Sequence, residues 1–103
     1  MSYQYTLSAL SNTTRRAVFE AVAAQPQSVA ELAKMQPVSR PAVSQHLKVL
    51  EQAGLVKATP RGTRRIYALD RTGLIALRSY LDQFWTDSLG AYAAEVHRQS
   101  AKH

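Results

Sequence analysis

The segment from Ser39 to Ala53 constrains the fold of this chain more than any other stretch. Pro37 disfavours a helix that continues through it, and Ser39 belongs to the residue types that cap helix N-termini. At the other end, Gly54 fits the left-handed position that follows a helix. We therefore predict a helix over 39–53 with both ends fixed by the sequence.

The two faces of this predicted helix differ in chemistry. An apolar side carries Val43, Leu47 and Leu50, which are spaced to pack against a core. The opposite side is polar without being acidic, and its residues are Pro41, Ser44, Gln45 and Lys48, with Arg40 flanking them. His46 lies beside Leu50 on the helical wheel, so we interpret it as a packed histidine.

Helices are also predicted upstream. Residues 3–10 form a first helix, and a second begins within 11–14 and stops before Pro26. Its inward residues are Ala17, Val18, Ala21 and Val22. Ser28 and Glu31 then form a capping box that starts a short helix ending near Met35. A short helix, a turn and the longer helix over 39–53 make a helix-turn-helix.

Two strand-like runs follow, 55–59 and 65–69, and they flank a turn at 60–63 that contains Pro and Gly. Asp70 or Thr72 then caps a long last helix. Its apolar stripe has a period near 3.6 and includes Leu74, Leu77, Leu81, Phe84, Trp85 and Tyr92. The predicted fold class is mainly α with a two-stranded β-hairpin wing, a winged helix-turn-helix forming one domain over 1–103.

The charge of the chain favours an anionic partner. Thirteen Lys and Arg against seven Asp and Glu give a net charge of +6 and a pI near 10.1. Residues 34–71 hold eight of the basic residues and two of the acidic ones, so the excess lies in the helix-turn-helix and the hairpin. Double-stranded DNA is the partner that this distribution and fold predict.

Side-chain chemistry divides the predicted DNA contacts into two groups. Arg reads guanine, Gln reads adenine, and Ser bonds to either base edge or phosphate, so the base-reading candidates are Arg40, Pro41, Ser44 and Gln45. Three arginines crowd the hairpin turn, where phosphates or a narrow minor groove would neutralise them. The candidates for backbone or minor-groove contact are Ser39, Lys48, Arg61, Thr63, Arg64 and Arg65.

Several functions are disfavoured by what the sequence lacks. It has no cysteine, which excludes disulfides and thiolate metal sites. We find no phosphate-cradling Gly-rich loop and no Ser, His and Asp arrangement with recognisable spacing, so we expect neither an enzyme nor a cofactor. No apolar run reaches the roughly 20 residues of a spanning helix, and a secretory leader is not apparent. We expect no membrane partner and a cytoplasmic location.

Three stretches together resemble the ArsR/SmtB family of bacterial repressors: 7–16, 37–56 and 61–67. The resemblance implies a homodimeric winged-helix repressor that binds an imperfect palindrome, often at its own promoter, and is released by a small effector, here unidentified. It also implies that the first and last helices form the dimer interface. The corresponding residues here are Tyr3, Leu7, Leu10, Leu77, Leu81, Phe84, Trp85 and Tyr92.

The metal sites of that family are not matched. The stretch 31–35, where some members carry cysteines, has none, and the last helix departs from the family's ligand pattern after Asp82. Glu95 is present and His97 is out of register, so we expect no metal site. Two alternatives stay open: a non-specific architectural DNA-binding protein, and a metal-responsive repressor that uses ligands of the last helix.

Overall fold

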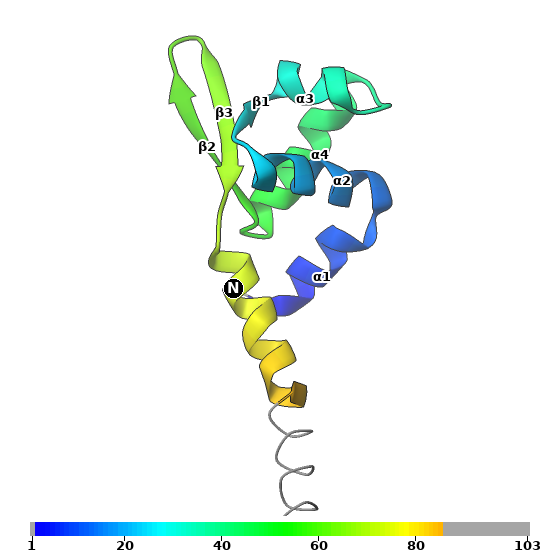
Figure 1. The fold of residues 1–103 in the computed structure, drawn as a ribbon, viewed down its shortest axis with the longest axis vertical. Coiled ribbons are helices and arrows are strands. Elements are labelled where there is room, and N and C mark those ends of the chain that lie inside the picture. The colour runs from blue at the N-terminus through cyan, green and yellow to red at the C-terminus, as the bar shows by residue number, and fades with distance from the viewer. Residues whose placement is uncertain (1, 86–103) are drawn as a thin grey trace, which may run out of the picture.

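The computed structural model describes residues 2–85, and its elements follow the predicted order (Figure 1). The two upstream helices are α1 (Tyr3–Ser11) and α2 (Thr13–Ala24), and the helix-turn-helix consists of α3 (Val29–Met35) and α4 (Arg40–Gln52). Three strands, β1 (Gln27–Ser28), β2 (Val56–Arg61) and β3 (Arg64–Leu69), form one sheet. Residues 72–85 are helical and lead away from the other elements at the end opposite the wing tip (Figure 1).

Side-chain caps fix the starts of the helices where the sequence predicts them. The backbone N–H of Arg15 donates to Oδ1 of Asn12 at 2.9 Å, which begins α2. The predicted capping box is complete, because the N–H of Glu31 donates to Oγ of Ser28 and the N–H of Ser28 donates to Oε1 of Glu31. Ser39 accepts from the N–H of Ala42 at 3.3 Å at the start of α4. Each cap contributes about 1 kcal/mol to helix stability.

The end of α4 also follows the prediction. Gly54 has a φ of 71°, and the N–H of Leu55 donates to the carbonyl oxygen of Leu50 at 2.9 Å. A second bond, from the N–H of Gly54 to the carbonyl of Glu51 at 3.0 Å, completes a Schellman motif. This motif turns the chain out of α4 and directly into β2.

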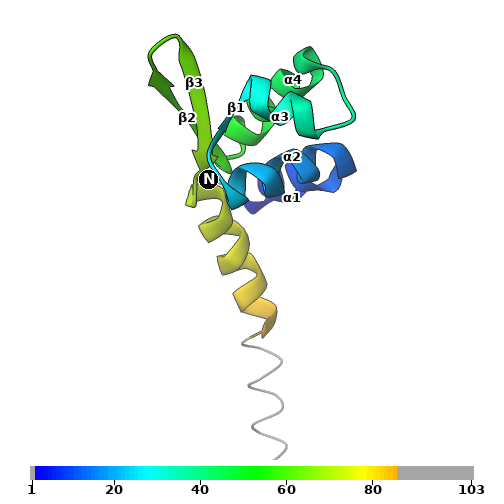
Figure 2. The ribbon, with the colours of Figure 1, turned by 45° about the horizontal axis from the view of Figure 1, so that its top comes forward.

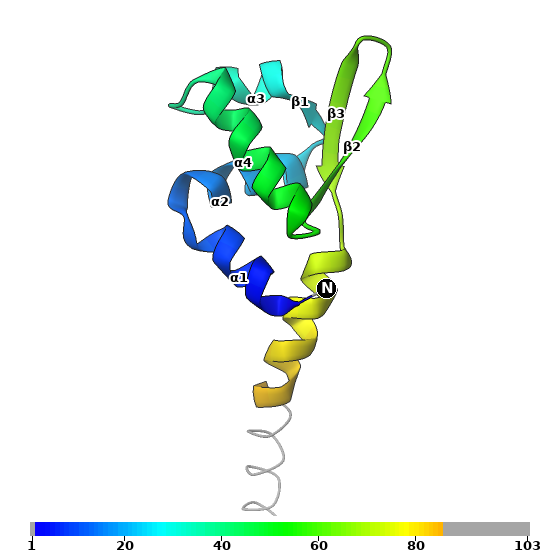
Figure 3. The same cartoon turned by 180° about the vertical axis from the view of Figure 1, so that it is seen from behind.

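The hydrophobic core lies where α2, α3 and α4 meet the sheet, and Figure 3 shows α4 passing in front of α2. Each fully buried Leu or Val stabilises the fold by about 1.5–3 kcal/mol. The inward side of α4 is buried as predicted, and Ala17 and Ala21 of α2 are only half-buried. The largest fully buried apolar side chains are Val18, Val22, Leu32, Val43, Leu47, Leu50, Leu55 and Val56.

The two-stranded hairpin wing forms as predicted from β2 and β3, and a short strand that the sequence did not indicate, β1, joins it to make a three-stranded sheet. The strand order is β1-β3-β2, because Gln27 and Ser28 pair antiparallel with Tyr67 and Ile66 at the base of the wing (Figure 2). A pair of residues is too short to show a period of two in the sequence, so β1 could not be detected. The third strand ties the wing to the start of α3.

The turn of the wing is also tighter than predicted. Pro60 and Arg61, expected in the turn, continue β2, and Arg61 pairs with Arg64. Only Gly62 and Thr63 connect the strands. Gly62 has a φ of 64°, whereas the φ of Thr63 is not positive. A positive φ at only the first of the two turn residues is the pattern of a type II′ turn. Pro60 is tolerated because β2 is an edge strand, where a missing N–H need not break the ladder.

Residues 72–85 are held to the rest of the chain at their first turn. The carboxylate of Asp70 accepts from both the N–H and the hydroxyl of Thr72, at 3.0 and 2.8 Å, so Asp70 is the cap. The N–H of Gly73 donates to the carbonyl of Gly54 at 2.8 Å, and the buried hydroxyl of Thr6 donates to the carbonyl of Gly73 at 3.2 Å. Within residues 2–85, no helix has the length and apolar character needed to span a bilayer.

Candidate nucleic-acid interface

The outer face of α4 is exposed and polar. Val43, Leu47 and Leu50 have no exposed surface, whereas the opposite side is open to solvent. Because the inward side is locked in the core, the backbone of α4 holds the outer side chains in fixed register. The predicted residues exposed on or beside this face are Ser39, Arg40, Pro41, Ser44, Gln45 and Lys48.

His46 lies between the two faces and is half-buried, as the helical wheel predicts. Burial lowers the pKa of its imidazole below the ordinary value, and the positive charge of Arg15 on α2 lowers it further. The neutral form is therefore favoured, and His46 adds no positive charge to the outer face of α4.

The wing supplies the second part of the interface. Its tip lies at the same end of the molecule as α3 and the start of α4 (Figure 1), and its predicted contact residues are all exposed. These residues are Arg61, Thr63, Arg64 and Arg65. Arg61 and Arg64 sit directly opposite each other across the two strands, where like charges repel. The single ion pair within 2–85 joins Arg78 and Asp82 at 3.9 Å, so no carboxylate neutralises the wing at salt-bridge distance.

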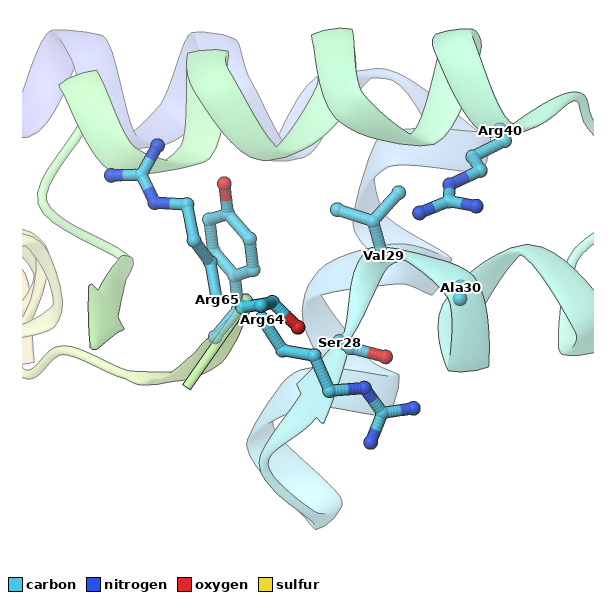
Figure 4. A pocket seen from close by; sticks show the side chains of 8 residues that line it. Ser28, Val29, Ala30, Arg40, Arg64 and Arg65 are labelled. Carbon is cyan, nitrogen blue, oxygen red and sulfur yellow. The ribbon is translucent and has the colours of Figure 1, made fainter. Parts of the chain in front are cut away.

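A cavity of about 250 Å³ separates the wing from the helix-turn-helix (Figure 4). Its walls come from the start of α3, the start of α4 and the strand β3. The guanidinium group of Arg40 turns toward this space, and Arg64 and Arg65 leave their strand in opposite directions (Figure 4). The lining residues are Ser28, Val29, Ala30, Arg40, Thr63, Arg64, Arg65 and Tyr67.

The sequence indicated half of the lining residues, Arg40, Thr63, Arg64 and Arg65, but not that they border one cavity. Ser28 was predicted only as a cap, and Val29 and Ala30 were not predicted to line a site. Tyr67 carried no signal of its own. The cavity exists because β1 pairs with β3 and brings the wing to the start of α3, and that pairing is not visible in local sequence patterns.

Most of the predicted dimer residues lie on an uncovered apolar surface formed by α1 and 72–85. The exposed fractions are 44% for Leu7, 52% for Leu81, 54% for Phe84 and 68% for Trp85. The ring of half-buried Tyr3 stacks on Tyr80 with centroids 3.9 Å apart, and Leu77 is also half-buried. Leu10 is half-buried and packs against the core of its own chain. Tyr92 lies outside the described residues.

The candidate metal ligands of the last helix are only partly described. Asp82 pairs with Arg78, one helical turn away. Over residues 2–85, His, Asp and Glu form no group of three or more that could hold a metal ion. Glu95 and His97 lie outside the described residues.

The capped helix pair, the exposed face of α4 and the basic wing define a winged helix-turn-helix DNA-binding protein. A model of the helix-turn-helix domain family matches residues 10–58, from the end of α1 into β2. The HTH-type transcriptional regulator Rv2034 of Mycobacterium tuberculosis is 61% identical over 85 residues, covering 82% of this chain and 79% of that protein.

Solved structures agree with this assignment. An ArsR-like transcriptional regulator from Rhodococcus sp. RHA1 is 28% identical with a TM-score of 0.77, covering 89% of this chain and 87% of that one. The homodimeric winged helix-turn-helix DNA-binding domain of Mb0332 from Mycobacterium bovis is 27% identical with a TM-score of 0.63, covering 82% and 77%. The chain belongs to the ArsR family: it is a DNA-binding transcriptional regulator and not an enzyme.

Proposed function

We propose that this regulator is a homodimeric repressor that binds an imperfect palindrome, its own promoter included, in a sequence-specific manner. The observation that carries the proposal is the exposed polar face of α4 beside a basic wing at the same end of the molecule (Figure 1). A helix of this kind enters the major groove while a wing follows the adjacent backbone or minor groove.

In this proposal, the residues act in two ways. Pro41, Ser44 and Gln45 contact base edges, since they lie on the outer face of α4. Arg40, which is exposed at the start of α4, belongs to the same base-reading group. The residues that contact phosphates or the minor groove are Ser39, Lys48, Arg61, Thr63, Arg64 and Arg65.

The proposed dimer forms through α1 and the helix that begins at residue 72. Leu81, Phe84 and Trp85 are more than half exposed, and apolar side chains gathered in this way mark a surface that a partner covers. Tyr3 of α1 adjoins this surface, because its ring stacks on Tyr80, which meets Phe84 edge-on, and Leu7 is an exposed apolar residue of the same helix α1. The relative Mb0332 carries the same fold as a homodimer.

Two further parts of the proposal follow from the family. We propose that an unidentified small effector releases the DNA, and that the regulator acts in the cytoplasm, where a bacterial chromosome lies. The effector would be recognised as a compound that raises the melting temperature of the protein and lowers its affinity for DNA together.

Titration of fluorescently labelled DNA tests sequence specificity. Fragments from the region upstream of the gene are titrated with the full chain, with unlabelled random-sequence DNA as competitor. We expect one fragment to bind about 10³-fold or more tighter than random DNA. Equal affinity for all fragments, with a steep loss on adding salt, would identify a non-specific architectural protein instead.

A further inference from the structure

We propose that a second cavity, between α1 and the end of α4, is the effector site and that it binds a small uncharged aromatic compound. This inference rests on the proposed function, because it gives the unidentified effector a place and a chemical class. The cavity has a volume of about 340 Å³, within the roughly 300–1,000 Å³ that is usual for small-molecule sites. In Figure 3, α1 lies below the end of α4.

Small side chains form the base of this cavity. Ala9 of α1 and Ala53 at the end of α4 are 1% and 3% exposed, and each has a single side-chain carbon. Larger side chains at these two positions would occupy the space between the helices. Val49, which is half-buried, adds an apolar wall. The base of the cavity is therefore apolar and favours an apolar ligand.

The rim of the cavity supplies an aromatic ring and hydrogen-bonding groups. Tyr5 is 67% exposed, so its ring has room to stack on a flat ligand. Ser8 and Gln52 are also exposed and add a hydroxyl and an amide. None of these three side chains forms a hydrogen bond with another of residues 2–85. Their polar groups are therefore available to orient a ligand.

The charge of the lining favours an uncharged ligand. The chain has a net charge of +6, yet every described residue that lines this cavity is uncharged. A charged group placed between the two helices would lose hydration without gaining a partner of opposite sign, which is unfavourable. A flat aromatic ring with one hydroxyl group matches the apolar base, the exposed tyrosine and the polar rim.

The cavity lies on a different side of α1 from the proposed dimer surface. A helix turns by about 100° per residue, so Tyr5 lies about 200° around α1 from Tyr3, whereas Leu7 lies only about 40° from it. Tyr3 stacks on Tyr80 at the proposed dimer surface. A dimer formed through that surface therefore leaves the cavity open to a ligand.

The two helices that border the cavity are joined at Gly73, the start of the last helix. The N–H of Gly73 donates to the carbonyl of Gly54, directly after α4, at 2.8 Å, and its carbonyl accepts from the hydroxyl of Thr6 of α1 at 3.2 Å. A ligand that moves α1 relative to the end of α4 therefore moves α4 relative to the dimer surface. The two recognition helices of a dimer must match the spacing of two half-sites, so this shift lowers the affinity for DNA.

Amide NMR spectra of the isotope-labelled full chain test the site, with naphthol as the probe and naphthoate as its charged counterpart. Naphthol should shift the signals of residues 5–9 and 49–53. Naphthoate should bind at least about tenfold more weakly, because its carboxylate has no partner in the cavity. Tyr5→Ala should weaken naphthol binding by about 5- to 10-fold, since it removes the stacking ring. Gln4→Ala changes an exposed neighbour that does not line the cavity, and it should bind naphthol as the wild type does.

Anisotropy titrations with the DNA fragment selected above test the effector role. Saturating naphthol should lower the DNA affinity of the wild type by about tenfold. Without naphthol, Tyr5→Ala should bind DNA as the wild type does, and its release should require about 5- to 10-fold more naphthol. Because such coupling is reciprocal, bound DNA should lower the affinity for naphthol by the same factor.

Several results would overturn the proposal while leaving the proposed function intact. They are the absence of naphthol binding, shifts at residues 81–85 in place of 5–9 and 49–53, equal binding of naphthoate, and an unchanged DNA affinity at saturating naphthol. Signals of Val49 and Gln52 that move on dilution of the ligand-free protein would show that a second copy covers the cavity, and would also overturn it. Failure of the wild type to bind DNA, with naphthol still bound between α1 and α4, would instead remove the proposed function.

Discussion

Gly73 shows how one residue connects the DNA-binding part of the chain to its last helix. A Cβ at this position would overlap the carbonyl oxygen of Ala53 and lie 3.0 Å from that of Gly54. Both oxygens belong to the end of α4 and its Schellman turn. The close approach lets the N–H of Gly73 bond to Gly54 and its carbonyl accept from Thr6.

Gly73→Ala is therefore expected to destabilise the protein, although Ala is the better helix former by about 1 kcal/mol. The overlap with backbone atoms should cost about 1–3 kcal/mol in the free energy of unfolding. Denaturant unfolding measures this change. Ser79→Ala, an exposed position in the same helix, is the control and should change stability by less than about 0.5 kcal/mol. A more stable Gly73→Ala variant would contradict this packing.

His46 predicts a pH dependence of stability. Its pKa is lower in the folded chain than in the unfolded chain, because of burial and then Arg15. The unfolded state therefore binds more protons, and the stability that neutral His46 provides is complete above the ordinary pKa of about 6.5. It is lost as the pH falls through the folded pKa.

Unfolding in denaturant between pH 5 and 8 measures this effect. We expect the free energy of unfolding to decrease below about pH 6.5 and the His46→Gln variant to show a weaker decrease. Asp70 also has a lowered pKa, from its bonds to Thr72, but its contribution is lost only in a more acidic range. An identical pH profile for the variant and the wild type would show that His46 does not titrate in this way.

Among the elements, we propose that α4 contacts the bases and that the wing contacts the DNA backbone or minor groove. Gln45 lies on the outer face of a helix whose other side is locked in the core. Lys48 is exposed about one turn further along α4. Its ammonium group offers a positive charge but no acceptor, so it suits a phosphate better than a particular base edge. In the proposed mode of binding, Gln45 reads a base and Lys48 binds a phosphate, so the two residues offer a test of these roles within a single helix.

Gln45→Ala should weaken binding to the selected DNA by about 1–3 kcal/mol and leave random DNA nearly unchanged. Lys48→Ala is the matched control, and it should weaken binding to both and reduce the salt slope by about 1. Anisotropy titrations at several salt concentrations measure both effects. If Gln45→Ala weakened binding to both DNAs equally, Gln45 would not read a base.

The elements differ in how far the sequence could predict them. Ser28, Ser39 and Gly54 determine helix ends through neighbours a few residues away, so α3 and α4 could be predicted. β1 and the fit of Gly73 could not, because they depend on residues far along the chain. The same distinction applies to the interface. The exposed face of α4 could be predicted from the helical period of its side chains. The cavity beside Arg40 could not, because it depends on the pairing of β1 with β3.

For the whole molecule, the described structure separates two surfaces. The wing and the start of α4 lie at one end, and the helix over 72–85 extends at the other (Figure 1). A dimer formed through the second surface leaves both copies of the first surface free. This arrangement suits two half-sites related by two-fold symmetry.

The exposed aromatic residues provide the test of that dimer. Trp85→Ser should raise the dissociation constant of the dimer by about 30-fold or more, since large buried aromatics contribute 2 kcal/mol or more at interface centres. Gln83→Ser changes an exposed polar neighbour and should have little effect. Sedimentation equilibrium measures both constants. If the Trp85→Ser dimer were as tight as the wild type, the apolar surface at residues 81–85 would not be the interface.

Footprinting of the full chain on the region upstream of its own gene tests whether the protein binds a specific sequence as a dimer. We expect a protected site with two-fold symmetry, whose half-sites lie about one or two helical turns apart. We also expect protection of both halves to appear at the same protein concentration. Uniform protection along the whole fragment, or a single protected half-site without a symmetric partner, would contradict sequence-specific binding by a dimer.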